Sequence, residues 1–380
     1  MAKYKDNTSD ETKEIFIVVT NACNLHCSYC YETNKNAPSV DICKVEEALT
    51  EEFTRRSEGF TRFLVNFHGG EPFLAFEKMK TIVEWMLGTF ADKDIIFTCT
   101  TNGTMLTGDM KEWLVGHKDV FIPILSLDGD RQSHNLNRSD SFDKIPISFF
   151  RDNWPLQGVK MTVCPNTVEK MYDNFVYIYK NGMYPNPSLA GEVGWNAGTH
   201  LDTYCRELSK IADFFVAHPA VKPTPILNLP LKKFSPEYKT YCGNGCNAGV
   251  GAVAFDINGN RYPCHTFIAD LKKKYERKKI DALFETLNRN CNVAVSPKCS
   301  GCPIASCCSP CYGLNYSYRG DMGAFDSVRC EFNKATVKIS AKMFARILQR
   351  HGDYPWMRYY SDTNLYHLIL GIKRVSEMDF

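Results

Sequence analysis

The chain has 380 residues, of which 44% are hydrophobic, and its formal net charge is +2. This composition is typical of a globular protein, and the small net charge excludes a strong general attraction to nucleic acid or to a membrane surface. No apolar run reaches the roughly 18 residues of a membrane span, and the polar first fourteen residues are unlike a signal peptide. We therefore expect a cytoplasmic protein with one large domain and one smaller domain.

Apolar runs alternate with helical patterns in the first part of the chain. Strands are predicted at 15–19, 63–67, 95–100, 121–127, 159–164 and 189–193. Helices are predicted at 44–57, 76–87, 110–115, 167–180 and 202–217. This alternation predicts an α/β fold of parallel units, and six units suit a partial (β/α)6 barrel better than a closed eightfold one. An open doubly wound sheet is the alternative, and either fold places its active site at the C-terminal ends of the strands.

Seventeen cysteines are present, a number that indicates metal binding in a cytosolic protein. Three of them, Cys23, Cys27 and Cys30, follow the first predicted strand with the spacing C-x3-C-x2-C. Three thiolates can hold three irons of a 4Fe–4S cube and leave the fourth iron open for another ligand. A zinc knuckle or scattered buried thiols would be the alternative interpretation of this loop.

Polar loops follow the next three predicted strands. They read HGGEP at 68–72, TTNGT at 100–104 and SLDG at 126–129. Two glycines let the backbone approach a ligand closely, and Glu71 can accept a hydrogen bond from an ammonium group. Each loop taken alone is also consistent with an ordinary turn.

In series, the cysteine loop and these three loops resemble the radical S-adenosylmethionine (SAM) enzymes over about the first 220 residues. The resemblance implies that SAM binds the open iron and is cleaved by one electron to methionine and a 5′-deoxyadenosyl radical. It also implies that GGEP binds the methionine amino group, while later polar residues approach the methionine carboxylate or the ribose. The residues that it assigns to SAM binding are Tyr29, Gly69, Gly70, Glu71, Asn102, Ser126 and Arg138.

Most of the remaining cysteines lie between residues 242 and 330. Two short strands are predicted at 253–257 and 261–262 around an Asn258-Gly259 turn, so Cys246 and Cys264 flank one hairpin. Eight thiolates in this region suit either two 4Fe–4S clusters or two structural zinc ions, and the spacing alone leaves both open.

The run C-x12-G-x4-C from Cys246 to Cys264, followed by a C-x2-C pair and a terminal cysteine, resembles the SPASM extension of peptide-modifying radical SAM enzymes. That extension carries two auxiliary 4Fe–4S clusters, which implies three clusters in this chain. By analogy, the ligands of the first auxiliary cluster are Cys242, Cys246, Cys264 and Cys311. Those of the second are Cys299, Cys302, Cys308 and Cys330.

The doublet Cys307-Cys308 departs from the SPASM pattern. The usual gap after Cys302 selects Cys308, whereas the usual gap before Cys311 selects Cys307, and we predict Cys308 as the ligand. The expected domains are a radical SAM partial barrel at 1–225, a small cysteine-rich SPASM domain at 226–334 and a helical segment at 335–380. Five prolines between 219 and 236 predict a connector between the first two.

The resemblance implies oxidative chemistry on a peptide. Sulfatase-maturating enzymes typically have an aspartate after the cysteine that corresponds to Cys264, whereas His265 stands here. A neutral imidazole can accept a proton, so His265 is the candidate catalytic base, with a supporting role beside the cluster as the alternative. We expect oxidative crosslinking of a ribosomally synthesised precursor peptide, with a thioether favoured over a carbon–carbon link. Formylglycine formation in sulfatases is the alternative, and a zinc-rich binding module is less favoured.

The expected partners follow from this chemistry. They are the precursor peptide and an external electron donor such as flavodoxin or ferredoxin, with no nucleic acid and no membrane. Only about fourteen residues precede the first predicted strand, so we expect a leader peptide to bind elsewhere or through a separate protein.

Overall fold

The computed structural model describes residues 12–378, apart from 33–34, 36–37, 156, 239–245, 269–276, 290–295, 300 and 309. Strands and helices alternate through its first part, as predicted. In chain order they are β1 (Thr12–Thr20), α1 (Ile42–Arg55), β2 (Arg62–Gly69), α2 (Phe76–Thr89), β3 (Asp94–Thr101), α3 (Gly108–Gly116), β4 (Phe121–Leu125), α4 (Arg131–Asn137), α5 (Ile147–Asn153), β5 (Gly158–Val163), α6 (Met171–Lys180), β6 (Tyr184–Leu189) and α7 (Ala197–Ala217).

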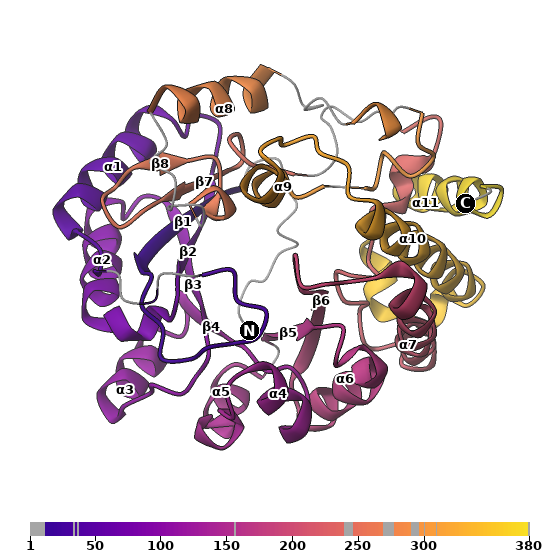
Figure 1. The fold of residues 1–380 in the computed structure, drawn as a ribbon, viewed down its shortest axis with the longest axis horizontal. Helices are drawn as coiled ribbons and strands as arrows, with labels where there is room; N and C mark the ends of the chain where they lie inside the picture. Colours follow the sequence, from indigo (N-terminus) through magenta and orange to yellow (C-terminus); the bar gives the residue numbers. More distant parts are fainter. Residues whose placement is uncertain are drawn as a thin grey trace.

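The strands form an arc with helices on its outer side (Figure 1). One sheet has the order β4-β3-β2-β1-β7-β8, and β5 and β6 form a second, two-stranded sheet. A single bridge between Ser126 and Lys160 joins the two sheets where β4 meets β5. The pairs among β1 to β6 are parallel, which confirms the predicted partial barrel.

Alternating burial sets the two faces of the strands. On β1, Ile15 and Ile17 are fully buried and belong to the core that includes Val45 and Leu49 of α1. Glu14 and Phe16 are less buried and therefore lie on the inner face of the arc. Asp41 caps the N-terminus of helix α1, because its side chain accepts a hydrogen bond from the Lys44 amide at 3.4 Å. The sequence pattern of each unit thus directs one strand face outward to a helix and one inward.

The sixth strand lies earlier than predicted. It spans Tyr184–Leu189, whereas the apolar pattern predicted 189–193. Pro185 and Pro187 concealed it, because proline donates no backbone hydrogen bond and argues against a central strand. In the described chain β6 pairs only with β5, so it is an edge strand, where proline is tolerated.

The predicted hairpin at the start of the cysteine-rich region is present as β7 (Ala252–Phe255) and β8 (Arg261–Tyr262). Strand β7 pairs in parallel with β1 and therefore extends the barrel sheet. Arg261 is bonded at 2.6 Å to Glu52 of α1, which also pairs with Lys13. Both ends of this ion-pair triad are largely buried, so the hairpin is held firmly against the barrel.

Within the described residues, four α-helices follow the hairpin. They are α8 (Arg277–Arg289), α9 (Tyr312–Arg319), α10 (Ser327–Leu348) and α11 (Asp362–Ser376). Helix α10 packs on α7, where the Tyr204 and Thr336 hydroxyls are 2.6 Å apart, and the expected boundary at residue 334 falls inside α10. The proline-rich connector is packed against these helices, since Ser340 donates to the Leu227 carbonyl at 2.6 Å. None of the helices within the described residues is long and apolar enough to cross a membrane.

Candidate active site

Cys23, Cys27 and Cys30 lie on the loop that leaves the C-terminal end of β1. A local turn shapes this loop, because the Cys30 amide donates to the Cys27 carbonyl at 3.1 Å. All three thiols are partly exposed, and burial raises the pKa of Cys23 and of Cys27. Iron would bind them as thiolates despite this shift, since coordination deprotonates a thiol. Three thiols on one loop fit a 4Fe–4S cluster that needs one further ligand.

Gly69 and Gly70 bring the loop after β2 directly against the cysteine loop. The Gly70 amide donates to the Thr20 carbonyl at 2.9 Å, and the next amide donates to Ala22 at 2.8 Å. A Cβ atom would lie 1.9 Å from the Thr20 carbonyl oxygen at Gly69, and 2.3 Å from that of Ala22 at Gly70. Only glycine permits this approach, which places both glycines directly beside the cysteine loop.

Glu71 is buried and bonded to protein donors. Its carboxylate accepts hydrogen bonds from the Thr101 hydroxyl at 2.7 Å, the Asn102 amide at 2.7 Å and the Phe73 amide at 3.1 Å. Burial raises the pKa of Glu71, and these hydrogen bonds oppose that shift. The carboxylate therefore ties the loop after β2 to the end of β3, a structural task that the sequence did not predict.

Asn102 continues this connection between loops. Its side-chain amide donates to Asn24 of the cysteine loop at 2.9 Å, and its oxygen accepts from the Thr104 amide at 2.9 Å. Ser126, after β4, is buried, and its amide donates to the Thr101 carbonyl at 2.8 Å. The polar groups predicted after strands one to four thus meet at one end of the barrel.

Asp128 holds a buried polar network that the sequence did not reveal. Its carboxylate accepts from the Tyr29 hydroxyl at 3.0 Å and from the Thr162 amide at 2.9 Å. It also pairs with Arg138, whose Nε lies 3.0 Å away and whose guanidinium is 5.2 Å from the centre of the Tyr29 ring. Burial opposes the charge of Arg138, but Asp128 outweighs it and raises the pKa of Arg138. Tyr29 and Arg138 therefore anchor the cysteine loop to β4 and β5.

His265 lies inside the barrel, opposite the loop after β2. Its ring centre is 4.5 Å from that of His68 and 4.5 Å from that of Phe16. The Tyr31 hydroxyl is 2.6 Å from His68 Nε2, so two histidines and one tyrosine form a connected group. Burial lowers the pKa of His68 to about 4 and lowers that of His265 well below its usual value. Sequence reasoning selected only His265, although His68 precedes the glycine pair and Tyr31 follows Cys30.

Cys246, Cys264 and Cys311 form one group of thiols beside His265 and the residues connected to it. The Cys264 sulfur lies 2.9 Å from the Thr266 hydroxyl, and the Cys311 sulfur lies 4.0 Å from the same oxygen. Burial raises the pKa of Cys264 to about 12, and the neighbouring Cys311 and Cys246 add to the shift. Cys242, the fourth predicted ligand, lies outside the described residues.

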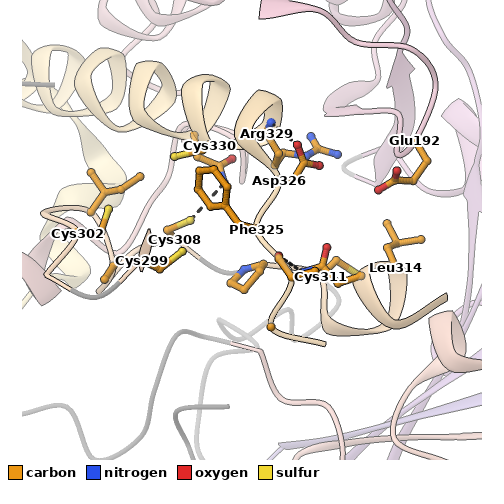
Figure 2. A pocket seen from close by; sticks show the side chains of 17 residues that line it. Glu192, Cys299, Cys302, Cys308, Cys311, Leu314, Phe325, Asp326, Arg329 and Cys330 are labelled. Atoms are coloured by element: carbon orange, nitrogen blue, oxygen red, sulfur yellow. Dashed lines mark hydrogen bonds between the residues drawn. The ribbon is translucent and has the colours of Figure 1, made fainter. Parts of the chain in front are cut away.

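Cys299, Cys302, Cys308 and Cys330 line a second cavity, which Cys311 of the first group also borders, and Figure 2 shows the four side chains around Phe325. Burial raises the pKa of Cys308, and interactions with Cys330, Cys302 and Cys299 raise it further. The structure thus brings together the four residues predicted for the second auxiliary cluster. Cys307 does not line this cavity and instead lies 3.3 Å from the Pro230 carbonyl oxygen.

This difference yields a test of the cysteine doublet. We expect Cys308→Ala to remove or degrade one auxiliary cluster and Cys307→Ala to leave the iron content unchanged, because only the Cys308 sulfur faces the other three thiols. Iron analysis and electron paramagnetic resonance of the anaerobically reconstituted variants measure this. Loss of iron in Cys307→Ala with wild-type iron in Cys308→Ala would reverse the assignment.

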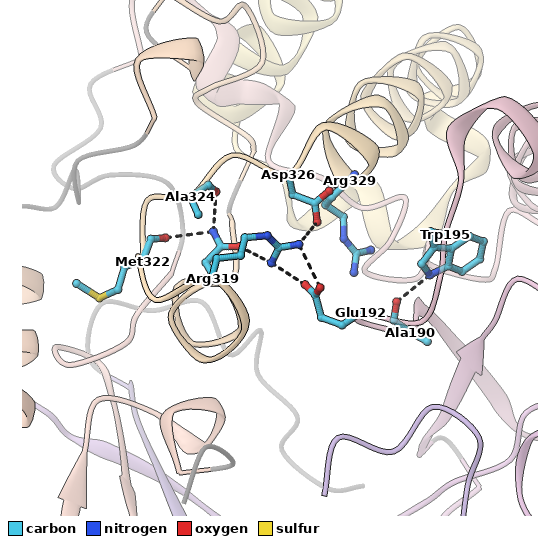
Figure 3. Close-up of polar contacts among 9 residues, drawn as sticks. Ala190, Glu192, Trp195, Arg319, Met322, Ala324, Asp326 and Arg329 are labelled. Atoms are coloured by element: carbon cyan, nitrogen blue, oxygen red, sulfur yellow. Dashed lines mark hydrogen bonds and ion pairs between the residues drawn. The ribbon is translucent and has the colours of Figure 1, made fainter. Parts of the chain in front are cut away.

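An ion-pair network joins the barrel to the second cysteine cavity (Figure 3). Arg319 of α9 donates to Glu192 at 2.8 and 3.1 Å and to Asp326 at 3.1 Å. Glu192 and Asp326 also line the cavity, and Glu192 lies in the loop after β6 with a φ of 55°. The network therefore fixes the four cysteines relative to the end of the barrel.

The geometry also bears on the zinc alternative. Within the described part of the chain, no three His, Cys, Asp or Glu side chains converge as binding of a single metal ion would require. This finding applies equally to iron, so it does not distinguish a zinc site from an iron–sulfur cluster.

Comparison with known proteins adds a family match. Residues 14–142 match the model of a 4Fe-4S single cluster domain. The cysteine-type anaerobic sulfatase-maturating enzyme of Clostridium perfringens (strain 13) is 31% identical over 131 residues, which cover 32% of this chain and 34% of that enzyme. The chain thus spans about a third of the length of this curated relative.

Two solved structures extend the comparison over most of the chain. Native anSMEcpe with bound AdoMet and Kp18Cys peptide has a TM-score of 0.68 at 20% identity and covers 90% of this chain and 99% of its own. Streptococcus suis SuiB bound to precursor peptide SuiA has a TM-score of 0.56 at 16% identity and covers 83% and 75%, respectively. Both likenesses concern the fold, which this chain shares.

Proposed function

We propose that this chain is a radical SAM enzyme related to anSME and SuiB, and that it oxidatively crosslinks a ribosomally synthesised precursor peptide, most favourably through a thioether. Two relatives of the same fold carry peptides in their solved structures, the Kp18Cys peptide in anSMEcpe and the precursor peptide SuiA in SuiB. Their peptides support a peptide as the substrate class.

The observation that carries the proposal is the state of His265. Its Nδ1 is buried and has no hydrogen-bond partner among the described residues, and burial keeps the imidazole neutral. A neutral imidazole with a free nitrogen can take a proton from a thiol without first losing one of its own. His68 and Tyr31 lie behind it and restrict the orientation of the ring. The group therefore places an unprotonated imidazole inside the barrel as the candidate proton acceptor, and its lowered pKa makes it a weak base.

The proposed ligands follow the grouping of the thiols. Cys23, Cys27 and Cys30 would hold the cluster that binds SAM. The auxiliary clusters would use Cys242, Cys246, Cys264 and Cys311, and Cys299, Cys302, Cys308 and Cys330, respectively. When bound, the SAM cluster supplies the electron that releases a hydrogen-abstracting 5′-deoxyadenosyl radical from SAM.

For SAM itself, Gly69, Gly70 and Glu71 would meet the methionine amino group, while Asn102, Ser126 and Arg138 would lie nearer its carboxylate and the ribose. Glu71 and Arg138 already have protein partners, so either role requires that a bond be shared or exchanged. The corresponding domains would be the barrel at 1–225, the SPASM domain at 226–334 and the helical segment at 335–380.

The balance of atoms and electrons in the proposed reaction explains why auxiliary clusters would be needed. Forming one thioether breaks a C–H bond and an S–H bond of the peptide and makes one C–S bond. One hydrogen leaves as an atom to the nucleoside radical, the other leaves as a proton to His265, and one electron remains. The two groups of C-terminal thiols would hold clusters that take this electron, which a flavodoxin or ferredoxin can exchange.

The test is co-expression with each short cysteine-containing peptide that the genes beside this one encode, followed by mass measurement with and without thiol alkylation. We expect the loss of two hydrogens per link and one fewer cysteine open to alkylation. The loss of two hydrogens with every cysteine still alkylated would indicate a carbon–carbon link instead of a thioether. A peptide of unchanged mass, under conditions in which SAM is cleaved, would contradict the proposal.

Formylglycine formation is the second candidate, because anSMEcpe has the higher TM-score of the two solved relatives. Its signature is the conversion of one cysteine of a sulfatase-derived peptide to an aldehyde, which reacts with a hydrazine probe. An aldehyde in the sulfatase-derived peptide, together with an unchanged mass of the peptide encoded by a neighbouring gene, would favour formylglycine formation over crosslinking.

A further inference from the structure

Lys160 is a charged residue of the barrel interior that the proposed chemistry does not use. It is partly exposed on β5, whereas its neighbours Val159 and Met161 are buried, so its side chain lies on the inner face. Its Nζ donates to the Ser188 hydroxyl of β6 at 2.9 Å, and its backbone forms the bridge to Ser126 after β4. Lys160 therefore stands in the wall where β4, β5 and β6 meet.

The charge of Lys160 has no counter-ion. Among the described residues, no carboxylate lies within ion-pair distance of its Nζ, and its hydrogen bond goes to a neutral hydroxyl. Asp128 attracts it from farther away, but this carboxylate already pairs with Arg138 and accepts from Tyr29. Burial, and then the charge of Arg138, lowers the pKa of Lys160. A cation of the barrel interior that lacks a carboxylate partner can receive one from a ligand.

Lys160 faces the same barrel interior as His68 and His265. His68 follows Asn66 on the inner face of β2, and its ring centre is 4.5 Å from that of His265. Lys160, on the inner face of β5, adds a positive charge to this interior. Asn66 of β2 and Thr98 of β3 add buried side-chain oxygens that have no hydrogen-bond partner among the described residues. The interior beside His265 is therefore polar and locally cationic.

We propose that Lys160 binds an acidic side chain, Asp or Glu, of the peptide substrate and thereby positions the reacting residue between His265 and the SAM-binding end of the barrel. This inference rests on the proposed peptide substrate and adds a sequence requirement to it. An ammonium–carboxylate pair is strong where water is scarce, and it would supply the counter-ion that Lys160 lacks. Lys160 is thus a specificity-determining residue, while proton transfer stays with His265.

The test compares two peptide pools on the reconstituted enzyme with SAM bound and without reductant, so that no crosslink forms. Both pools contain hexapeptides with random flanking residues and capped ends, with Glu at the centre of one pool and Gln at the centre of the other. We expect the wild type to bind the Glu pool about tenfold more tightly, a difference of about 1.4 kcal/mol, because only the carboxylate forms a charge-assisted hydrogen bond with the ammonium group. Lys160→Met should abolish this preference, and Lys160→Arg should retain most of it.

Two further measurements separate this role from others. Lys118→Met is the matched control, since Lys118 is exposed on the outside of the barrel, and it should keep the wild-type preference. Lys160→Met should bind SAM as the wild type does, and its melting temperature should stay equal or rise, because the substitution removes a cation that has no carboxylate partner among the described residues.

Equal binding of both pools by the wild type would overturn the proposal. So would weakened SAM binding by Lys160→Met with the Glu preference intact, which would assign Lys160 to the cosubstrate. If Lys160→Met does not fold, Lys160→Gln replaces it in the comparison. An enzyme that prefers the Glu pool but never modifies its peptide would refute the crosslinking proposal and leave this inference standing.

Discussion

Replacing Cys23, Cys27 and Cys30 together by alanine will abolish SAM cleavage and leave the C-terminal iron in place. These three thiols lie together on the loop after β1. The two C-terminal groups of thiols lie on other segments of the chain. If all clusters are 4Fe–4S, the reconstituted protein should hold about twelve irons and the triple variant about eight. The measurements are iron and sulfide analysis, together with chromatographic detection of 5′-deoxyadenosine after reduction with dithionite.

Cys43→Ala is the control for this experiment, because Cys43 is an exposed thiol of α1 that belongs to none of the three groups. It should keep the full iron content and the wild-type rate of SAM cleavage. Zinc without iron in the anaerobically reconstituted wild type would contradict the whole assignment. If the triple variant still formed 5′-deoxyadenosine, the loop after β1 would not be the SAM site.

The second large effect concerns Asp128. Asp128→Ala leaves the Arg138 guanidinium buried without its partner and removes the acceptor of Tyr29 and Thr162. Breaking a buried ion pair on one side costs about 3–5 kcal/mol, so we expect a loss of that size in the free energy of unfolding. Denaturant titration of the protein before cluster reconstitution measures it.

A matched control exists on the surface of the same region. Asp143 pairs with Arg131 at 2.5 Å, but both side chains are more than half exposed. Asp143→Ala should therefore change the free energy of unfolding by less than about 1 kcal/mol. The double variant Asp128→Ala/Arg138→Met should recover part of the loss, since it no longer buries an unpaired charge. Equal destabilisation by Asp128→Ala and Asp143→Ala would show that the buried network contributes nothing.

The outline of the fold could be predicted because its signals are local. Each of β1 to β5 has an apolar core that overlaps the predicted strand, and each predicted polar loop stands at a strand end. The four cysteines around Phe325 could also be selected in advance, because the resemblance to the SPASM extension groups them. In this group, the choice of Cys308 over Cys307 remains a prediction that its place in the cavity favours.

The rest depends on contacts between distant segments. Strand β7 pairs with β1 across more than two hundred residues, and no local pattern announces such a pairing. Asp128 belongs to an ordinary SLDG turn, and only folding brings Tyr29 and Arg138 to its carboxylate. The same holds for Lys160, whose missing counter-ion becomes visible only when the barrel interior is assembled.

Isotope transfer tests the central claim most directly, because the account requires a hydrogen atom to move from the peptide to the SAM-derived radical. The peptide encoded beside this gene is made with full deuteration, exchanged in water to restore its S–H and N–H protons, and incubated with reduced enzyme and unlabelled SAM. The account predicts 5′-deoxyadenosine that carries one deuterium, in an amount equal to the links formed. Unlabelled 5′-deoxyadenosine beside a crosslinked peptide would contradict it.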